Sequence, residues 1–547
     1  MPKLTAGSTE AVRVRPGAKG YRLIGLDIAN NQAAAGVLLR LGINDSTQTT
    51  TAQIPSHIII DRCYIHGQAL PNKTSVGISA DADYVAVINS YVTEIHDGSG
   101  DDQAILSINA NGPFIFRNNY LEAAGENTMF GGGDPNIPHA NPCDATIEGN
   151  WYFKDPAKWS NSVYAVKNLF ELKTGCRLKI QGNTFQNHKS GVQSQYFPIV
   201  MKTANQGATC KIDNGYYNQV ADITFAYNRI INVPQGFAIG RVAACDINQF
   251  GSTTFYIHDN LITGLGSGHT QDGAPKLLQW SYPKQEAGGE IVYPRNVTFS
   301  HNTIGTITKF GIDAYRYQHL ETQGNYVHDH NFHSNIVVGK WFVSGTYNNA
   351  TSINQRYLAQ FTAKNNLSIS SVGTVFPAAP NYSQANFNNL FINAAGGDFR
   401  LTPAATSAYP GADGYPVGAN IGTLDACTAG STTGTWTVGS CPGGTVVPPP
   451  TVSLTANGAT TPITVPPGSN VVLQWTVSGA TGCEANASNP YGATIWHGSK
   501  SFSAGTHSET INPAQSATYS IGCTHASGQA TASAVVNVSQ VCAQPPL

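Results

Sequence analysis

The stretch KIQGNTFQNH, residues 179–188, places an asparagine at position 183 inside a pattern that is otherwise typical of a β-strand. Ile180 and Phe185 favour strands, whereas asparagine is depleted in them. The same pattern, apolar-x-x-Asn-x-apolar, recurs along the chain. Its asparagines are Asn119, Asn150, Asn183, Asn228, Asn260, Asn302 and Asn335, with looser copies at Asn366 and Asn389, and with Cys63 and Ser90 in the same place upstream.

The spacing between these copies is 23 to 45 residues and centres near 30. A period of this length built from strands indicates a solenoid or a propeller, and two or three short strands per unit favour the solenoid. We therefore expect about eleven coils stacked at roughly 4.8 Å, a rod of roughly 50 Å. Asparagine suits the corner of a coil because it tolerates left-handed backbone. Stacked amides can also hydrogen-bond along the rod as a ladder.

Composition narrows the class of protein. Charged residues make up 11 % of the 547 residues and the formal net charge is −2, so nucleic acid is not an expected partner. Ten cysteines without a CxxC pair indicate disulfides formed in an oxidising compartment, which predicts a secreted protein. No apolar run is long enough for a membrane span. The opening residues lack the apolar segment of a signal peptide, so we expect a processed, engineered or truncated start.

The repeat stops near residue 400, and the composition changes after it. We predict an all-β chain with a parallel β-helix over residues 1–426 and a Gly/Thr/Pro-rich linker over 427–450, in which Cys427 and Cys441 form a bridge. Short alternating strands over 451–540 predict an immunoglobulin-like β-sandwich. Cys483 and Cys523 stand where a disulfide would staple such a sandwich, and Cys542 is left to pair elsewhere or to stay free.

Residues 58 to about 425 resemble the right-handed parallel β-helix proteins of the pectate-lyase-like superfamily, and more narrowly a group of secreted proteins of soil bacteria. The resemblance is carried by IIIDRCYIHG (58–67), DDQAI (101–105), GPFIFRNNYLEAAGENTMFGGGDPNIP (112–138) and VKNLFELKTGCRLKIQGNTFQN (166–187). It implies a lyase, hydrolase, epimerase or binder of polysaccharides. Neither the calcium-site pattern of pectate lyases nor the paired-aspartate pattern of the hydrolases is matched. The C-terminal part resembles bacterial immunoglobulin-like modules.

The ladder asparagines serve as a ruler for candidate catalytic residues. Asp102, Asp134 and Lys167 lie 17, 16 and 16 residues before the next ladder position, which predicts that neighbouring coils present them at nearly one angular position. Glu171 would reach the same face or an adjacent one. Carboxylates and a lysine on one groove could supply the acid, the base and the cation for cleaving a polysaccharide. The alternative is a buried ladder of ion pairs that closes the face of the solenoid.

The segment GENTMFGGGDP, residues 125–135, is the least strand-like stretch between two coils. We expect a loop there, with Glu126 and Asn127 forming the wall of a cleft or part of a metal site, and a strained turn as the alternative. Calcium is the candidate metal, with Asp101, Asp102 and Asp134 as its ligands.

Aromatic residues farther along predict sugar-stacking platforms, with ordinary packing as the alternative. The candidates are Trp280, Tyr282 and Tyr315, with Arg316 beside them to bind a carboxylate. His328, His330 and His333 allow a zinc site or histidines that face solvent. Nucleotide-binding and nucleophile-elbow motifs are absent, so cofactor chemistry is not indicated.

Two functions remain open. The first is a secreted lyase or hydrolase acting on a polysaccharide substrate. The second is a non-catalytic extracellular scaffold or carbohydrate binder, with the sandwich mediating attachment to a cell surface or self-association. The state of the predicted charged residues discriminates between them, because an open groove favours the enzyme and buried, mutually paired charges favour the scaffold.

Overall fold

A computed structural model gives the fold of the chain. It describes residues 1–7, 9–31, 33–98, 100–159, 163–188, 197–204, 218–242, 253–266, 276–281, 295–307, 310–314, 330–339, 361–369, 381–384, 389–442, 451–478, 480, 482–489, 494–502, 505–525 and 528–539. The chain divides into two compact units, Met1–Pro442 and Gly443–Leu547.

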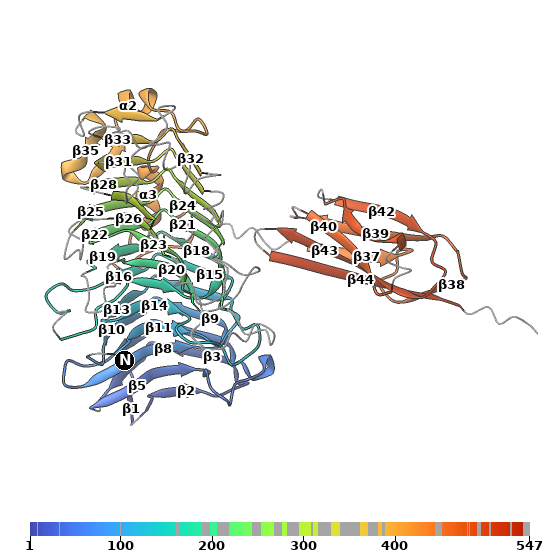
Figure 1. Cartoon of the computed structure of the whole chain (residues 1–547). Coiled ribbons are helices and arrows are strands. Elements are labelled where there is room, and N and C mark those ends of the chain that lie inside the picture. Colours follow the sequence, from blue (N-terminus) through green and yellow to red (C-terminus); the bar gives the residue numbers. More distant parts are fainter. Residues whose placement is uncertain are drawn as a thin grey trace, which may run out of the picture. The chain divides into compact units, whose positions relative to one another are not determined.

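Three long parallel sheets, A, B and C, form most of the first unit, and from residue 3 to residue 333 successive strands join the three sheets in that order (Figure 1). In the described residues, sheet A holds β1 (Lys3–Ala6), β4 (Asp27–Asn30), β7 (Tyr64–His66), β10 (Tyr91–Ile95), β13 (Tyr120–Ala123), β16 (Trp151–Phe153), β19 (Thr184–Gln186), β22 (Arg229–Val233), β25 (Leu261–Leu265), β28 (Thr303–Ile307), β31 (Ile336–Gly339), β33 (Leu367–Ile369) and β34 (Tyr382–Gln384). Sheet B holds β2 (Val12–Val14), β5 (Ala34–Leu41), β8 (Lys73–Ala80), β11 (Gln103–Ser107), β14 (Glu126–Phe130), β17 (Phe170–Leu172), β20 (Ile199–Ala204), β23 (Phe237–Val242), β26 (Lys276–Ser281) and β29 (Phe310–Ala314). Sheet C holds β3 (Lys19–Ile24), β6 (Ser56–Asp61), β9 (Asp83–Ile88), β12 (Phe114–Arg117), β15 (Ala145–Glu148), β18 (Gly175–Gln181), β21 (Val220–Ala226), β24 (Thr253–His258), β27 (Arg295–Ser300), β30 (His330–His333) and β32 (Phe361–Lys364).

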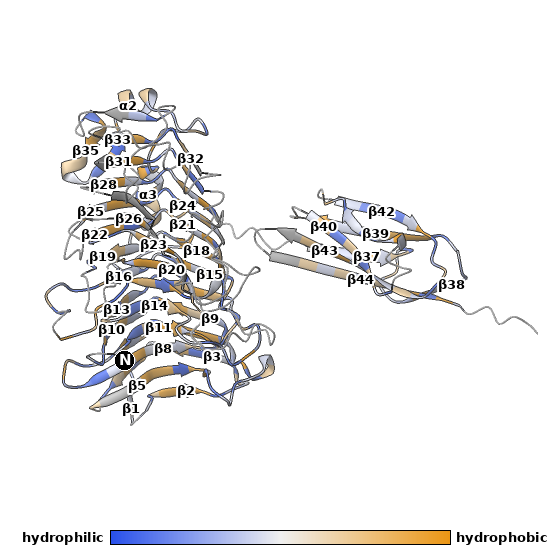
Figure 2. Ribbon diagram, viewed as in Figure 1, coloured by the Kyte–Doolittle hydropathy of each residue, from blue (hydrophilic) through white to orange (hydrophobic). Residues whose placement is uncertain are grey.

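This arrangement confirms the predicted right-handed parallel β-helix. Strands of consecutive coils pair in register, as where Thr146 of β15 faces Lys179 of β18. Apolar side chains from the three sheets meet in one continuous core, and hydrophobic residues mark the strands in Figure 2. Within that core the rings of Tyr152 and Phe185 stack with centroids 4.5 Å apart. Each coil buries one side chain at each inward-facing strand position, which explains why apolar residues recur at these positions in every repeat.

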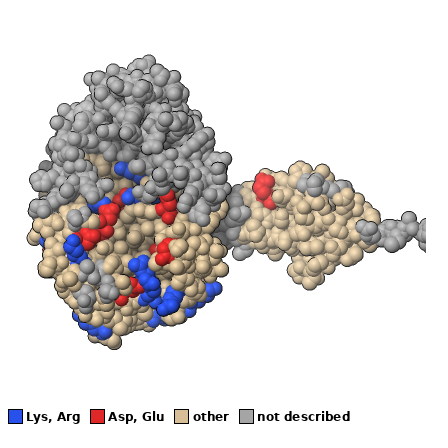
Figure 3. Space-filling view, turned by 60° about the horizontal axis from the view of Figure 1, so that its bottom comes forward, with Lys and Arg blue, Asp and Glu red and all other residues tan. Residues whose placement is uncertain are grey.

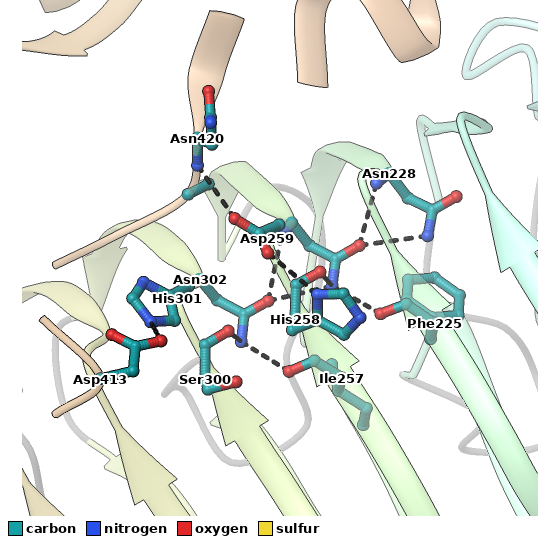
Figure 4. A network of polar contacts seen from close by, with 12 residues as sticks. Phe225, Asn228, Ile257, His258, Asp259, Ser300, His301, Asn302, Asp413 and Asn420 are labelled. Atoms are coloured by element: carbon teal, nitrogen blue, oxygen red, sulfur yellow. Dashed lines mark hydrogen bonds and ion pairs between the residues drawn. The ribbon is translucent and has the colours of Figure 1, made fainter. Parts of the chain in front are cut away.

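The predicted asparagine ladder is present at the corner between sheets C and A (Figure 4). From Asn119 to Asn366, each Nδ2 donates to Oδ1 of the asparagine on the next coil at 2.9–3.1 Å. Ser90 takes part through its backbone N–H, which donates to Oδ1 of Asn119 at 2.9 Å. The last rung is Asn381 rather than the predicted Asn389, which is exposed.

The left-handed backbone at this corner lies one residue earlier than predicted. The residue that precedes each ladder position has a φ of 50° to 65°, and the ladder asparagines themselves do not. These residues are Arg62, Asn89, Asn118, Gly149, Gly182, Tyr227, Asp259, His301, Ser334 and Asn365. The turn therefore points each following asparagine into the stack, where its amide is hydrogen-bonded on both sides.

A segment after the last coils runs back along this corner. We call this segment, residues 409–441, the strap, and it contains α3 (Ile421–Thr428). It is preceded by η5 (Ala394–Gly396), β36 (Asp398–Leu401) and α2 (Pro403–Ala408). The strap contacts the left-handed residues in turn: the backbone N–H of Asn420 donates to Asp259 Oδ1 at 3.0 Å, and that of Trp436 to Asn118 Oδ1 at 3.3 Å. A Cβ on Gly149 would lie 2.2 Å from the ring of Trp436. Residues 427–442, expected in the linker, thus pack on the β-helix.

The second unit is a two-sheet sandwich. One sheet holds β37 (Thr451–Ala456), β39 (Val471–Ser478) and β42 (Gly505–Ile511). The other holds β38 (Ile463–Val465), β44 (Gly528–Val538), β43 (Ala517–His525), β40 (Gly482–Ala487) and β41 (Gly498–Lys500). Trp475 and Trp496 pack edge to face in the core between them, with ring centroids 5.4 Å apart.

Three disulfides are present among the described residues. Cys427–Cys441 closes the end of the strap, as predicted, and Cys143–Cys176 joins neighbouring coils. Cys483–Cys523 also forms, but it joins the adjacent strands β40 and β43 of one sheet and does not link the two sheets.

Candidate functional site

Two glutamates from neighbouring strands of sheet B form the centre of the candidate site. Glu126 begins β14 and is 1 % exposed, and Glu171 lies in β17 and is 4 % exposed. Nε2 of Gln103, on β11, donates to Glu126 Oε2 at 2.9 Å. Burial and, after it, the nearby charge of Glu171 raise the pKa of Glu126 to about 8. Glu126 therefore holds a proton at neutral pH, next to a second carboxyl group.

Three lysines surround this pair. Lys167 Nζ lies 3.9 Å from Glu126 Oε1 and also pairs with Asp101, and Lys173 Nζ lies 3.8 Å from Glu171 Oε1. Burial lowers the pKa of Lys167 and lowers that of Lys202, on β20, to about 8, while the charge of Glu171 opposes both shifts. The cluster thus combines one carboxyl group, Glu126, whose pKa is raised, with two ammonium groups, Lys167 and Lys202, whose pKa values are lowered.

The cluster reaches solvent through its outer members. The side chain of Asp101 is 55 % exposed and that of Lys173 is 23 % exposed, whereas that of Lys167 is 6 % exposed. Acidic and basic side chains stand close together on the face of the β-helix seen in Figure 3. The two glutamates therefore lie one side chain below a charged surface.

Lys154 is a buried lysine near Glu126. Nζ of Lys154 donates to the carbonyl oxygens of Ala123, Ala124 and Gly125 at 2.6, 3.0 and 2.5 Å, and to Asn127 Oδ1 at 3.0 Å. Burial lowers the pKa of Lys154 to about 7. Asn127 is fully buried and acts as part of this cage, so it forms no wall of a cleft.

The segment that contains Glu126 and Asn127 differs from the sequence prediction. Residues 126–130 form strand β14 inside sheet B, where a loop was expected. Pairing with β11 and β17 supplies the backbone hydrogen bonds that stabilise this strand despite its polar residues. The chain leaves the coil only after residue 130.

Asp102 and Asp134 are not brought together. Asp102 is fully buried on the coil next to Gly125, and burial followed by the charge of Asp97 raises its pKa to about 8. Asp134 is half-buried, and its Oδ1 accepts from Asn218 Nδ2 at 3.2 Å. Counting back from the ladder passes through corner loops of different length, which is why a constant offset does not select one angular position.

Several other candidates fall outside what the structure describes. Tyr282, Tyr315, Arg316 and His328 lie outside the described residues, as does the side chain of Trp280, whose backbone pairs with β23. In the described parts of the chain, no three His, Cys, Asp or Glu side chains gather into a group that could hold a metal ion. Asp101, Asp102 and Asp134, the predicted calcium ligands, are all described and form no such group, whereas the zinc site stays a prediction because His328 is not described.

The sequence located four members of the cluster, Asp101, Glu126, Lys167 and Glu171. It missed four others: Gln103 and Lys173, which lie two residues from predicted members, the buried Lys154, and Lys202, which lies on another coil. A lysine inside the apolar strand IVMKTA of β20 was a signal for Lys202.

In comparisons with known proteins, no family model, curated protein or solved structure matches the chain. None of the described helices has the length and hydrophobicity that crossing a membrane requires.

Proposed function

We propose that the chain is a secreted carbohydrate-active enzyme, a polysaccharide lyase or glycoside hydrolase, in which Glu126 and Glu171 form the acid–base pair. The observation that carries the proposal is the contact between two buried carboxyl groups. A ladder of structural ion pairs alternates opposite charges, whereas two adjacent carboxyl groups share protons and separate into an acid and a base. Disulfides support an extracellular location.

The same pair serves either reaction. In a lyase, Glu171 removes the proton α to a uronate carboxylate, an ammonium group offsets the developing charge, and Glu126 protonates the departing glycosidic oxygen as the new carbon–carbon double bond forms. In a hydrolase, Glu126 protonates the glycosidic oxygen and Glu171 activates water or attacks the sugar. In this proposal Lys173 and Lys202, both near Glu171, hold a carboxylate of the substrate, and we therefore propose an acidic polysaccharide rather than a neutral one.

The test is a panel of uronans and neutral glucans, with and without calcium, assayed for ultraviolet-absorbing unsaturated products and for new reducing ends. We expect product from the full chain, and a loss of about 100-fold or more in Glu126→Gln and in Glu171→Gln. Glu148→Gln is the matched control, because Glu148 is also a buried glutamate but pairs with Arg117 on sheet C. No product on any substrate, or equal activity in all three variants, would refute the proposal.

A non-catalytic extracellular scaffold or carbohydrate binder is the second candidate, and burial of the cluster supports it. The side chains of Glu126, Lys167 and Glu171 are each at most 6 % exposed, and each lies beside an oppositely charged group. The pectate-lyase-like resemblance suits both candidates. For the sandwich we propose attachment to a cell surface or self-association, which sedimentation of the full chain at increasing concentration would test.

A further inference from the structure

A second column of left-handed residues runs along the corner that leads into sheet C. His57, Tyr84, Asp144 and Arg177 occupy equivalent positions on four coils, with φ between 53° and 60°. On the coil between Tyr84 and Asp144, the equivalent residue is Pro113. Proline has no long side chain to continue the column, so the surface is hollowed at this coil.

The hollow is a cavity of about 480 Å³. Tyr84, Asn111, His139, Asn141, Asp144 and Arg177 line it, together with the backbone around Gly112. This volume suits a ligand of one or two sugar rings, because small-molecule sites commonly occupy roughly 300–1,000 Å³. The cavity lies at the edge of sheet C, whereas Glu126 and Glu171 lie on sheet B.

Internal hydrogen bonds hold the polar walls in place. The Arg177 guanidinium donates two parallel hydrogen bonds to the Asp144 carboxylate, from Nε to Oδ1 at 2.7 Å and from Nη2 to Oδ2 at 2.8 Å. The backbone N–H of Asn111 donates to Asp83 Oδ1 at 2.7 Å. Groups fixed in this way lose little conformational entropy when a ligand binds.

The aromatic wall is Tyr84, which is 53 % exposed. Its ring stacks on His57 with centroids 4.5 Å apart and planes 12° apart, so the ring is held in one orientation. A fixed, exposed aromatic ring next to amides and carboxylates matches the two surfaces of a sugar, an apolar C–H face and a rim of hydroxyl groups.

The charge of the lining selects the kind of sugar. Arg177 is the one Lys or Arg side chain in the lining, and its guanidinium is already neutralised by Asp144. Asp83 adds a further carboxyl group to the wall. An anionic ligand such as a uronate or a phosphate would therefore meet no uncompensated Lys or Arg charge, whereas hydroxyl groups would find both donors and acceptors.

We infer that this cavity is a binding site for a neutral saccharide unit, separate from the carboxylate cluster. It would hold a glycan on the β-helix whether or not the chain cleaves one. The inference does not depend on the proposed activity.

Affinity electrophoresis of the full chain tests it, in native gels that contain soluble xylan, galactomannan, mixed-linkage β-glucan or polygalacturonate. We expect at least one neutral polymer to retard the protein. Tyr84→Asn removes the aromatic wall, and Asp144→Asn removes the carboxylate charge that holds Arg177 in place. Each should weaken that binding roughly tenfold, and asparagine tolerates the left-handed backbone at both positions.

Two controls separate this site from other effects. Tyr256→Asn removes a tyrosine of similar exposure, 48 %, from β24 of the same sheet but outside the cavity, and it should bind within about twofold of the unaltered chain. Glu126→Gln should also bind normally, even if it abolishes cleavage. If Tyr84→Asn does not fold, Asp144→Asn decides. Retardation by polygalacturonate alone, by no polymer, or equally in all variants would overturn the inference.

Discussion

Replacing Asn183 by alanine removes one rung of the ladder and tests whether the ladder stabilises the β-helix. The Asn183 amide donates to the carbonyl oxygens of Ile147 and Gln181 at 2.9 and 3.0 Å and to Asn228 Oδ1 at 3.0 Å. Its Oδ1 accepts from both the backbone N–H and Nδ2 of Asn150 at 2.9 Å. All five bonds are buried, so water cannot replace them without opening the corner.

The cost follows from these bonds. A hydrogen bond contributes a net stability of about 0.5–1 kcal/mol, so loss of these five bonds in Asn183→Ala should destabilise the β-helix by about 3–5 kcal/mol. The unit Met1–Pro442 has an unfolding entropy of about 0.9 kcal/mol/K at about 2.1 cal/mol/K per residue. The midpoint of thermal unfolding should therefore fall by about 3–5 °C.

Differential scanning calorimetry of the full chain measures this shift. Asn187→Gly is the matched control, because Asn187 is a partly exposed asparagine four residues away whose left-handed backbone glycine can keep. Asn187→Gly should move the midpoint by less than about 1 °C. An Asn183→Ala shift as small as that of the control would show that the amide stack contributes no stability.

Three further outcomes are expected. Gly182→Ala should lower the midpoint of thermal unfolding and expose the strap to protease, because the new Cβ would lie 2.7 Å from Cys441 Sγ. Gly434 also has a positive φ but has open space around it, so Gly434→Ala should show the effect of backbone strain alone. The pKa of Glu126 is raised to about 8, so the folded state retains this proton and loses stability as pH rises from about 4.5 to 8. In Glu126→Gln, the free energy of unfolding measured with urea should lack this decrease with pH. The pKa of Lys154 is lowered to about 7, so the unfolded state binds this proton more tightly than the folded state does. The free energy of unfolding should therefore rise between about pH 7 and 10.5. Lys154→Met should remove that rise and destabilise the fold by about 3–5 kcal/mol.

Much of the fold was predictable because one coil repeats the same local requirements. Each rung needs an amide at the corner and apolar residues on both sides, and these requirements leave a pattern that Asn183 and its equivalents repeat. The strap left no such pattern. Its place on the corner depends on contacts such as that of Trp436 with Asn118, residues more than 300 positions apart, which no local periodicity encodes.

The candidate site was predictable in part for the same reason. Lys167 was chosen by its offset from the ladder, Glu171 because it follows Lys167 by four residues, and Glu126 because it lies in an unusual segment. Asp134 was grouped with them by a constant offset, although it lies beside Asn218. Loops of unequal length between strands change the offset, so the angular position of a side chain follows from strand register and not from its distance along the chain.

The sequence by itself determined the β-helix, its ladder and the β-sandwich that follows, because burial and backbone hydrogen bonding impose a repeating or alternating pattern on residue types. Tertiary structure alone decided which charged groups meet. The contact of Glu126 with Glu171, the cage around Lys154 and the cavity beside Tyr84 each join residues from different coils. Proton affinity depends on burial and on the distances between charges, and both are fixed only when the coils are stacked.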